Sequence, residues 1–292
     1  MDLYFEAYSG IAGDMTIGAL LDLGADKEVL IEALKSMNFG EYKLIFERCK
    51  KKGIEAFQFD VITEENSHEH HHHHLHEHEH CHGKGEGHHH EHGHCHEHKH
   101  ESEGCCCCHE HIHEHEHHHV HRGLKEIIEI INSGNFSQKA KENAIKIFKI
   151  IGKAESKAHG VDIKEIHFHE VGAIDSIIDI VGVCVLLDNL NPEHIYFSDL
   201  YEGKGFVKCA HGMMPVPAPA VLNIATENKV PMKIIDDEGE HVTPTGIAIT
   251  AFFSEGLPPY SFVVKRVGLG AGKKDFKNTT NILRVMEIEK RK

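Results

Sequence analysis

The sequence begins with the stretch LYFEAYSGIAGDM, residues 3–15, which introduces the alternation on which the predicted fold depends. Its first five residues are typical of a short strand, and its glycines indicate a loop that leads into a helix ending near Gly24. Strand-like and helical runs continue to follow one another along the chain, and some neighbouring strands are spaced like hairpins. We therefore predict an α+β or α/β fold, with a mixed sheet and interleaved helices.

One segment departs from this alternation. Residues 68–121 contain 26 of the 32 histidines, together with 11 glutamates and four consecutive cysteines. Large apolar side chains are rare in the segment: Leu75, Ile112 and Val120. Because so few apolar groups cannot offset the entropy of ordering it, we predict a disordered, metal-binding insertion. Residues 1–67 and 122–292 then form the two parts of one globular body.

The composition of the insertion indicates a role in metal binding. Neutral imidazole binds nickel, copper, zinc and cobalt. Alternating histidine and glutamate places neighbouring imidazoles on the same side of an extended chain. A flexible segment gathers such ligands without fixing their geometry, so we expect several loose sites of low selectivity. Two other interpretations stay open at this point: a linker lengthened by repeats, and a non-enzymatic store or chaperone for nickel or other divalent metals.

The charge and the cysteines exclude several classes of protein. The chain has 31 basic and 46 acidic residues and a formal net charge of −15, which disfavours binding to nucleic acid. No apolar run reaches the roughly 18 residues of a membrane helix, and the N-terminus does not resemble a secretory signal. Consecutive cysteines are unlike a disulfide framework. We expect a cytoplasmic protein that contacts no membrane.

The densest group of ionisable residues outside the insertion lies between residues 166 and 179. His167 and His169 face the same side if this segment is extended. Glu170 follows them, and Asp175 and Asp179 fall on one face of the next predicted helix. Asp179 stands within an apolar run, where a carboxylate needs a partner or a cation. The alternative is structural, with Asp175 as a helix cap, Asp179 paired with a lysine and the histidines in ordinary hydrogen bonds.

Shorter motifs add candidate ligands. Cys209 and His211 could supply a soft and a borderline metal ligand, although an ordinary turn explains this pair as well. The loops at residues 9–14 and 242–246 each lead into a predicted helix, and such a helix start suits a phosphate group. The run from Gly268 to Lys274 could bring backbone and two cations to the same group, or could form a simple glycine turn. The residues of these loops that could contact a bound group are Gly10, Gly13, Asp14, Thr243, Thr245 and Gly270.

Read in order, four of these segments resemble the LarC family of nickel insertion proteins. They are SGIAGDM (9–15), IHFHEVGAIDSIIDIVG (166–182), HGMMPVPAPA (211–220) and TPTG (243–246). The resemblance implies that nickel is placed in pyridinium-3,5-bisthiocarboxylic acid mononucleotide, with two Ni–S bonds and one Ni–C bond. The product is the nickel-pincer nucleotide cofactor of lactate racemase and related enzymes.

The resemblance also implies partners. The family's enzyme uses CTP, and its longer members carry a further C-terminal domain associated with CTP binding. This sequence stops at Lys292. We therefore expect either that a separate polypeptide supplies that domain or that this chain acts differently, and CTP stays an open cofactor of this chain. We also expect a homo-oligomer.

Site roles follow from the resemblance as a hypothesis. His167 and His169 would hold nickel. Glu170 and Asp175 would act as ligand or as the base that removes the ring proton, because a Ni–C bond at an aromatic carbon requires loss of that proton. Asp179 would orient a nickel-binding histidine by accepting a hydrogen bond from its other ring nitrogen.

The remaining motifs would serve the same reaction. Cys209 with His211 would complete the nickel site or relay the metal to it. Asp14 and the glycine loops would contact the nucleotide. The histidine-rich insertion would raise the local nickel concentration by tethering. A metal hydrolase with a His-x-His pair is a weaker alternative, because few further histidines lie outside the insertion.

Overall fold

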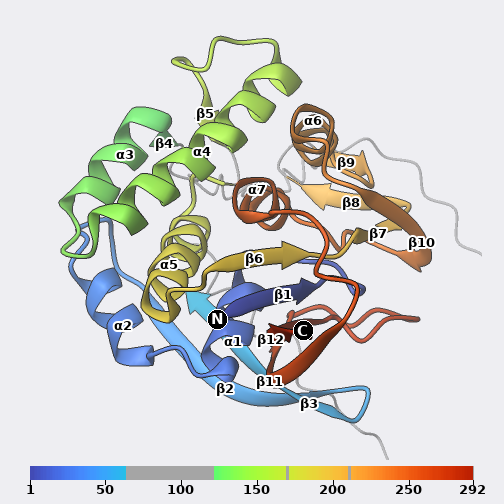
Figure 1. Cartoon of the computed structure of the whole chain (residues 1–292). Helices are drawn as coiled ribbons and strands as arrows, with labels where there is room; N and C mark the ends of the chain where they lie inside the picture. The colour runs from blue at the N-terminus through green and yellow to red at the C-terminus, as the bar shows by residue number, and fades with distance from the viewer. Residues whose placement is uncertain (64–121, 169–170, 210–211, 292) are drawn as a thin grey trace, which may run out of the picture.

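The computed structural model describes residues 1–63, 122–168, 171–209 and 212–291 (Figure 1). The histidine-rich insertion, predicted to be disordered, lies outside the described residues. Three candidate site residues also lie outside them: His169, Glu170 and His211.

A mixed sheet forms the centre of the fold, as the sequence predicts (Figure 1). Its strand order is β2-β3-β11-β12-β1-β6. Strand β1 pairs with β12 in antiparallel and with the edge strand β6 in parallel orientation, and β11 runs parallel to β3. The six strands have these bounds: β1 Asp2–Glu6, β2 Lys43–Lys51, β3 Ile54–Ile62, β6 His194–Phe197, β11 Phe262–Ala271 and β12 Ile282–Lys290.

Helices and three small strand pairs complete the described part of the chain. The strand pairs are β4 (Arg122–Gly123) with β5 (His167–Phe168), β7 (Leu200–Lys204) with β10 (Met232–Glu238), and β8 (Phe206–Cys209) with β9 (Gly212–Pro215). The helices are α1 Gly13–Leu23, α2 Lys27–Lys35, α3 Leu124–Ser133, α4 Gln138–His159, α5 Ile174–Leu190, α6 Pro219–Asn228 and α7 Pro244–Phe253.

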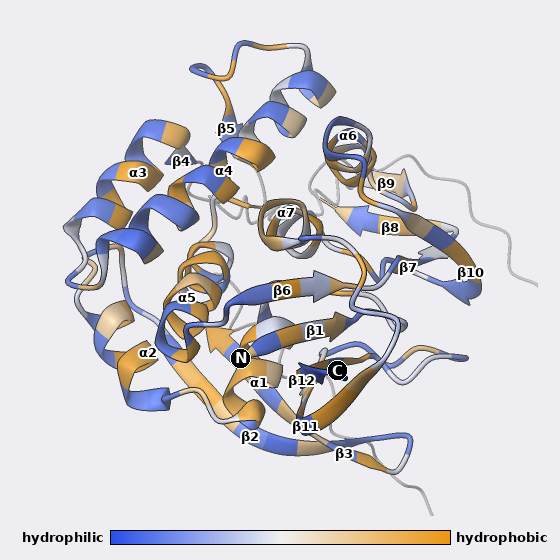
Figure 2. Ribbon diagram, viewed as in Figure 1, coloured by the Kyte–Doolittle hydropathy of each residue, from blue (hydrophilic) through white to orange (hydrophobic). Residues whose placement is uncertain are grey.

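The position of each helix in the fold reflects how apolar its surface is. Helix α1 lies on β3, β11 and β12, and α5 packs on α1, α2 and α4. Figure 2 shows that α5 and α7 are apolar over most of their surface, whereas α3 and α4 alternate between apolar and polar residues. A helix that is apolar all round belongs inside, and an amphipathic helix covers the outside. Within the described residues, every helix is too short or too polar to cross a membrane.

The glycines near residue 270 have a different role from the predicted one. The segment from Gly268 was expected to form a loop or a turn, but Gly268 and Gly270 lie within β11. A Cβ atom on Gly270 would lie 1.9 Å from the Met15 carbonyl oxygen, and one on Gly268 would lie 2.1 Å from that of Ala19. These glycines therefore let α1 cross the strand closely, and the expectation of a glycine turn was wrong.

Candidate functional site

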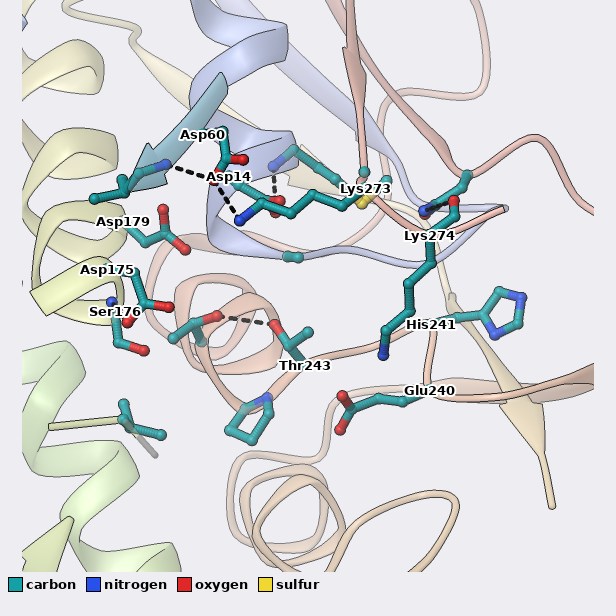
Figure 3. A pocket seen from close by; sticks show the side chains of 18 of the residues that line it. Asp14, Asp60, Asp175, Ser176, Asp179, Glu240, His241, Thr243, Lys273 and Lys274 are labelled. Carbon is teal, nitrogen blue, oxygen red and sulfur yellow. Dashed lines mark hydrogen bonds and ion pairs between the residues drawn. The ribbon is translucent and has the colours of Figure 1, made fainter. Parts of the chain in front are cut away.

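A cavity of about 350 Å³ lies where the N-terminal ends of α1, α5 and α7 meet (Figure 3). One wall is formed by the start of α1 and the first turns of α5. The start of α7 forms another, and the connection between β11 and β12 closes the far side with two lysines. The polar residues that line the cavity are Asp14, Asp60, Asp175, Ser176, Asp179, Glu240, His241, Thr243, Thr245, Lys273, Lys274 and Asn281.

Two carboxyl groups face each other at the closed end of this cavity. Asp14 stands in the first turn of α1, where its carboxylate accepts a hydrogen bond from the Met15 backbone N–H at 2.7 Å. Burial raises the pKa of Asp14 to about 6, and the negative charges of Asp60 and Asp175 act in the same direction. Burial and the charge of Asp14 hold the pKa of Asp179 well above its ordinary value. Asp14 and Asp179 therefore bind protons more readily than ordinary carboxyl groups, and a cation beside them would favour their charged forms.

Lys273 lies directly beside the acids. Its ammonium group forms an ion pair with the carboxylate of Asp60 (Figure 3). Burial alone would lower the pKa of Lys273, but the hydrogen bond to Asp60 and the charges of Asp14 and Asp179 raise it overall. Lys273 consequently stays protonated and partly neutralises the acidic end of the cavity.

The opposite end of the cavity is suited to an anion. Thr243 caps α7, since its hydroxyl oxygen accepts from the Gly246 backbone N–H at 3.1 Å. The hydroxyl groups of Thr243 and Thr245 are hydrogen-bonded to each other at 2.8 Å. Figure 3 shows the Lys274 side chain extending towards Thr243 and Glu240. A helix N-terminus, two hydroxyl groups and a lysine together form a favourable environment for a phosphate group.

Five of the predicted site residues are brought together here. They line one cavity although they come from three distant segments: Asp14, Asp175, Asp179, Thr243 and Thr245. Asp175 and Asp179 do share one face of α5, as their spacing predicts. The sequence did not connect either of them with Asp14, because that proximity depends on how α1 packs on α5.

Other predicted residues lie elsewhere in the described structure. His167 stands on β5, is exposed, and does not line this cavity. Cys209 lines a neighbouring cavity of about 390 Å³, which shares Glu240, Pro244 and Lys274 with the first. Its thiol lies 3.4 Å from the Gly212 carbonyl oxygen.

The predicted glycine contacts are explained by packing. Gly10 has a φ of +88°, and a Cβ atom there would lie 2.1 Å from the His241 carbonyl oxygen. Gly13 leaves room for Asp179, and Gly270 is covered by α1. These glycines do not line the cavity. They are required because neighbouring backbone and side chains approach them closely.

Asp60 was missed by the sequence analysis. It stands near the end of β3 and is only 6% exposed, so its carboxylate is out of place in a buried strand unless it has a partner. Strands β3 and β11 run parallel, with Ala271 paired with Gln58. Two residues further along in each case, the same register brings Lys273 beside Asp60. A charged residue near the end of an apolar strand was the available signal.

The described residues do not form a complete metal cage. Within residues 1–63, 122–168, 171–209 and 212–291, no three histidine, cysteine, aspartate or glutamate side chains are placed to hold one metal ion. The cavity can nevertheless attract a divalent cation at its acidic end and an anion at its lysine end. A molecule that carries a phosphate and also binds a metal matches this arrangement.

Comparisons with known proteins agree with that chemistry. The chain matches the family described as nickel insertion protein over residues 3–292. It is 45% identical to a protein of Alkaliphilus metalliredigens over 98% of this chain and 60% of the relative. It is 38% identical to one of Desulfitobacterium hafniense over 97% and 57% of the two chains. A third relative, from Clostridium acetobutylicum, is 42% identical over 97% and 63%.

All three relatives are named pyridinium-3,5-bisthiocarboxylic acid mononucleotide nickel insertion protein. The chain spans about 60% of the length of these curated relatives. No solved structure matches it.

Proposed function

Since the chain belongs to the nickel insertion protein family, we propose that it places nickel in pyridinium-3,5-bisthiocarboxylic acid mononucleotide. The observation that carries this proposal is the cavity at the three helix N-termini, which joins an acidic end to a lysine-containing end. The substrate has matching parts, because its thiocarboxylate groups bind a transition metal and its phosphate is an anion.

Nickel is the cargo of this reaction, so the protein does not need a complete set of ligands. Two sulfur atoms and one ring carbon of the mononucleotide bind the metal in the product that the resemblance implies. Carboxylates such as Asp175 and Asp179 then have to hold nickel only until the substrate replaces them. A small number of carboxylate ligands, which are hard, suits the release of nickel to the substrate, since soft sulfur ligands bind nickel more strongly.

Formation of the Ni–C bond requires a base. The ring carbon gives its electron pair to nickel while its proton leaves to a carboxylate. Asp14, with a pKa of about 6, can take that proton near neutral pH. Asp175 stays a candidate for the same step, as expected from the sequence, because it lines the same cavity.

The phosphate belongs at the other end of the cavity. Lys274 and the hydroxyl groups of Thr243 and Thr245 would receive it at the N-terminus of α7. This places the ring of the mononucleotide towards Asp14 and Asp179. The orientation also keeps the substrate phosphate away from the carboxyl groups of Asp14 and Asp179, which would repel it. At the α7 end, Lys274 extends towards Glu240 and offsets the charge of that carboxylate.

The described residues on either side of the insertion can be related to this cavity. Asp60 and Val61, just before it, line the cavity. Arg122, just after it, pairs in β4 with Phe168 of β5, and Gly123 pairs with His167. Histidines tethered at these two points would therefore supply nickel at a high local concentration. His167 with His169 would pass the metal on, since Val171, two residues further, again lines the cavity.

The remaining roles are proposed without a described contact. Glu170 is kept as a possible ligand or base, and His211 with Cys209 as a relay. CTP and a separate polypeptide for the rest of the relatives' length are retained as proposals, as is a homo-oligomer. The assay below is therefore run with and without CTP.

Insertion can be measured directly. The purified chain is incubated with nickel and the mononucleotide, and the product is identified by the mass of one bound nickel with loss of protons. The Asp179→Asn variant should lose at least about 90% of the rate, because a carboxylate facing the metal is removed. Asp22→Asn is the matched control, since Asp22 lies on α1 but pairs with Arg48 at 2.6 Å outside the cavity. Equal rates for the two variants, or no product from the unmodified chain with or without CTP, would refute the proposal.

A further inference from the structure

Two buried ionisable residues beside the cavity have no role in the reaction proposed above. Glu202 lies on β7 and is fully buried. Its Oε1 atom accepts hydrogen bonds from the backbone N–H groups of Gly203, His241 and Val242, at 2.8, 2.7 and 3.2 Å. Its Oε2 atom has no hydrogen-bond partner among the described residues. The buried carboxyl group of Glu202 therefore fixes one turn of the connection between β10 and α7.

His241, the residue held by Glu202, is itself completely enclosed. Its ring nitrogens lie 2.9 Å from the Gly239 carbonyl oxygen and 3.2 Å from the Thr279 hydroxyl. The ring stacks on Phe276 with 3.6 Å between ring centroids. Its backbone carbonyl accepts from the Ile11 N–H at 2.9 Å. Figure 3 shows that the ring points away from the acids, so His241 does not act on a ligand among them.

These contacts connect three segments that are far apart in the sequence. Ile11 belongs to the loop that leads to Asp14. Phe276 and Thr279 belong to the β11–β12 connection that carries Lys273 and Lys274. Residues 239–243 lead into Thr243 and Thr245. We call this meeting point the His241 junction, made of Glu202, His241, Ile11, Phe276 and Thr279.

The surroundings of the His241 junction leave little freedom for movement. A Cβ atom on Gly203 would lie 2.1 Å from the Gly239 carbonyl oxygen and 2.5 Å from the His241 ring. Asp237 accepts hydrogen bonds from the backbone N–H groups of Asn278 and Thr279, at 3.1 and 2.8 Å. The β11–β12 connection is therefore held from both β10 and the junction, in a densely packed region.

We propose that Glu202 and His241 are positioning residues of the candidate site: through the His241 junction they fix the segments of Asp14, Thr243 and Lys273 relative to one another. This inference rests on the proposed function for its meaning, because the three segments form the acidic and the anion-binding walls of the cavity. A shift of about 1 Å between catalytic groups typically lowers the rate about 100-fold.

The test compares two substitutions at Glu202 with a matched control. Glu202→Leu removes the acceptor, whereas Glu202→Gln keeps an oxygen that can accept from the three N–H groups. The control is Glu6→Leu, because Glu6 is also largely buried and pairs with Arg284 on another part of the sheet, outside the cavity. Each variant of the full chain is examined by thermal unfolding, steady-state insertion kinetics and backbone hydrogen exchange.

We expect Glu202→Leu to lower kcat/KM for the mononucleotide about 100-fold under conditions where the variant is folded. Glu202→Gln should restore it to within about fivefold of the unmodified chain. Glu6→Leu should destabilise the chain without changing kcat/KM of the folded fraction. The inference is overturned if Glu202→Leu and Glu6→Leu lose activity only in proportion to their folded fraction, or if Glu202→Gln fails to restore the rate.

Hydrogen exchange keeps the inference testable without any activity. In Glu202→Leu, protection should fall together in residues 9–14, 239–246 and 272–281, and Glu202→Gln should retain it. Faster exchange limited to residues 241–242 would contradict the junction. If Glu202→Leu does not fold, Thr279→Val replaces it, and the same three segments should lose protection. Absence of insertion by the unmodified chain would refute the proposed function, while the exchange result would still decide the role of the junction.

Discussion

The carboxyl group of Asp179 lies against Gly13, so closely that a Cβ atom on residue 13 would lie 2.4 Å from the Asp179 Cβ atom. Gly13 begins α1 and Asp179 is in the second turn of α5. The absence of a side chain at residue 13 thus lets an acid of α5 reach the acid that follows it, Asp14. This contact explains why the first loop ends with Gly-Asp.

Replacing Gly13 by alanine should separate these two acids. We expect a destabilisation of about 1–3 kcal/mol from overpacking and at least a tenfold loss of insertion rate. Gly152→Ala is the control, because a Cβ atom there meets only ordinary contacts at 3.5 Å within α4. Thermal unfolding and single-turnover insertion measure the two effects, and an unchanged rate in Gly13→Ala would show that the Asp14–Asp179 contact is dispensable.

The stability of the chain should depend on pH through Asp14. Burial raises its pKa from the ordinary 3.8 to about 6, so the folded chain binds this proton more tightly than the unfolded chain. Stability should therefore fall as the pH rises from about 4 through 6, and stay lower above 6. Asp14→Asn removes the titrating group and should stabilise the nickel-free chain by about 1–3 kcal/mol at pH 8.

Chemical denaturation at pH 5 and pH 8 checks this prediction. Asp14→Asn should narrow the difference in stability between the two pH values. An Asp14→Asn variant that is less stable than the unmodified chain at pH 8 would show that Asp14 is charged and well paired there.

Lys273 should be required for both charge balance and stability. Lys273→Met removes the ammonium group that pairs with Asp60, and with it the positive charge beside Asp14. We expect a loss of about 1–3 kcal/mol at neutral pH, because Asp60 is buried. The control is Lys265→Met, because Lys265 of β11 forms an exposed ion pair with Glu289 of β12; this substitution should change stability by less than about 1 kcal/mol. Equal effects of the two substitutions would argue against a special role for Lys273.

His167 and His169 are predicted to transfer nickel rather than to support the fold. His167 is exposed on the two-residue strand β5. The double substitution to alanine should leave the thermal unfolding temperature within about 2 °C and abolish insertion at limiting nickel. Full activity of the double variant at limiting nickel would remove both histidines from the account.

The sequence predicted features that depend on local chemistry. The predicted end of the first helix near Gly24 is confirmed, and Asp26 and Ser137 cap α2 and α4 through equally local contacts. Each depends on a residue with a specific backbone or hydrogen-bonding preference, so neighbours in the chain are sufficient. Asp175 and Asp179 share one face of α5 for a similar reason, because that depends only on their spacing along the helix.

Features that depend on distant packing could not be predicted in this way. The pairing of Asp60 with Lys273 requires the parallel register of β3 and β11, which are about 200 residues apart in the chain. Gly268 and Gly270 resemble a turn in sequence, but the approach of α1 determines their role. The hydrogen bonds of Glu202 to His241 and Val242 are equally invisible without the fold, because one acidic residue in a strand indicates no partner.

We infer that the folded body inserts nickel and that the histidine-rich segment 68–121 only supplies the metal. The most direct test uses the chain without residues 68–121, saturating nickel and one equivalent of the mononucleotide, followed through a single turnover. Nickel-containing product should form at a rate close to that of the full chain, with a several-fold lower nickel stoichiometry, and should be lost in Asp179→Asn. Failure of the shortened chain to form product at saturating nickel, while it remains folded, would contradict the account.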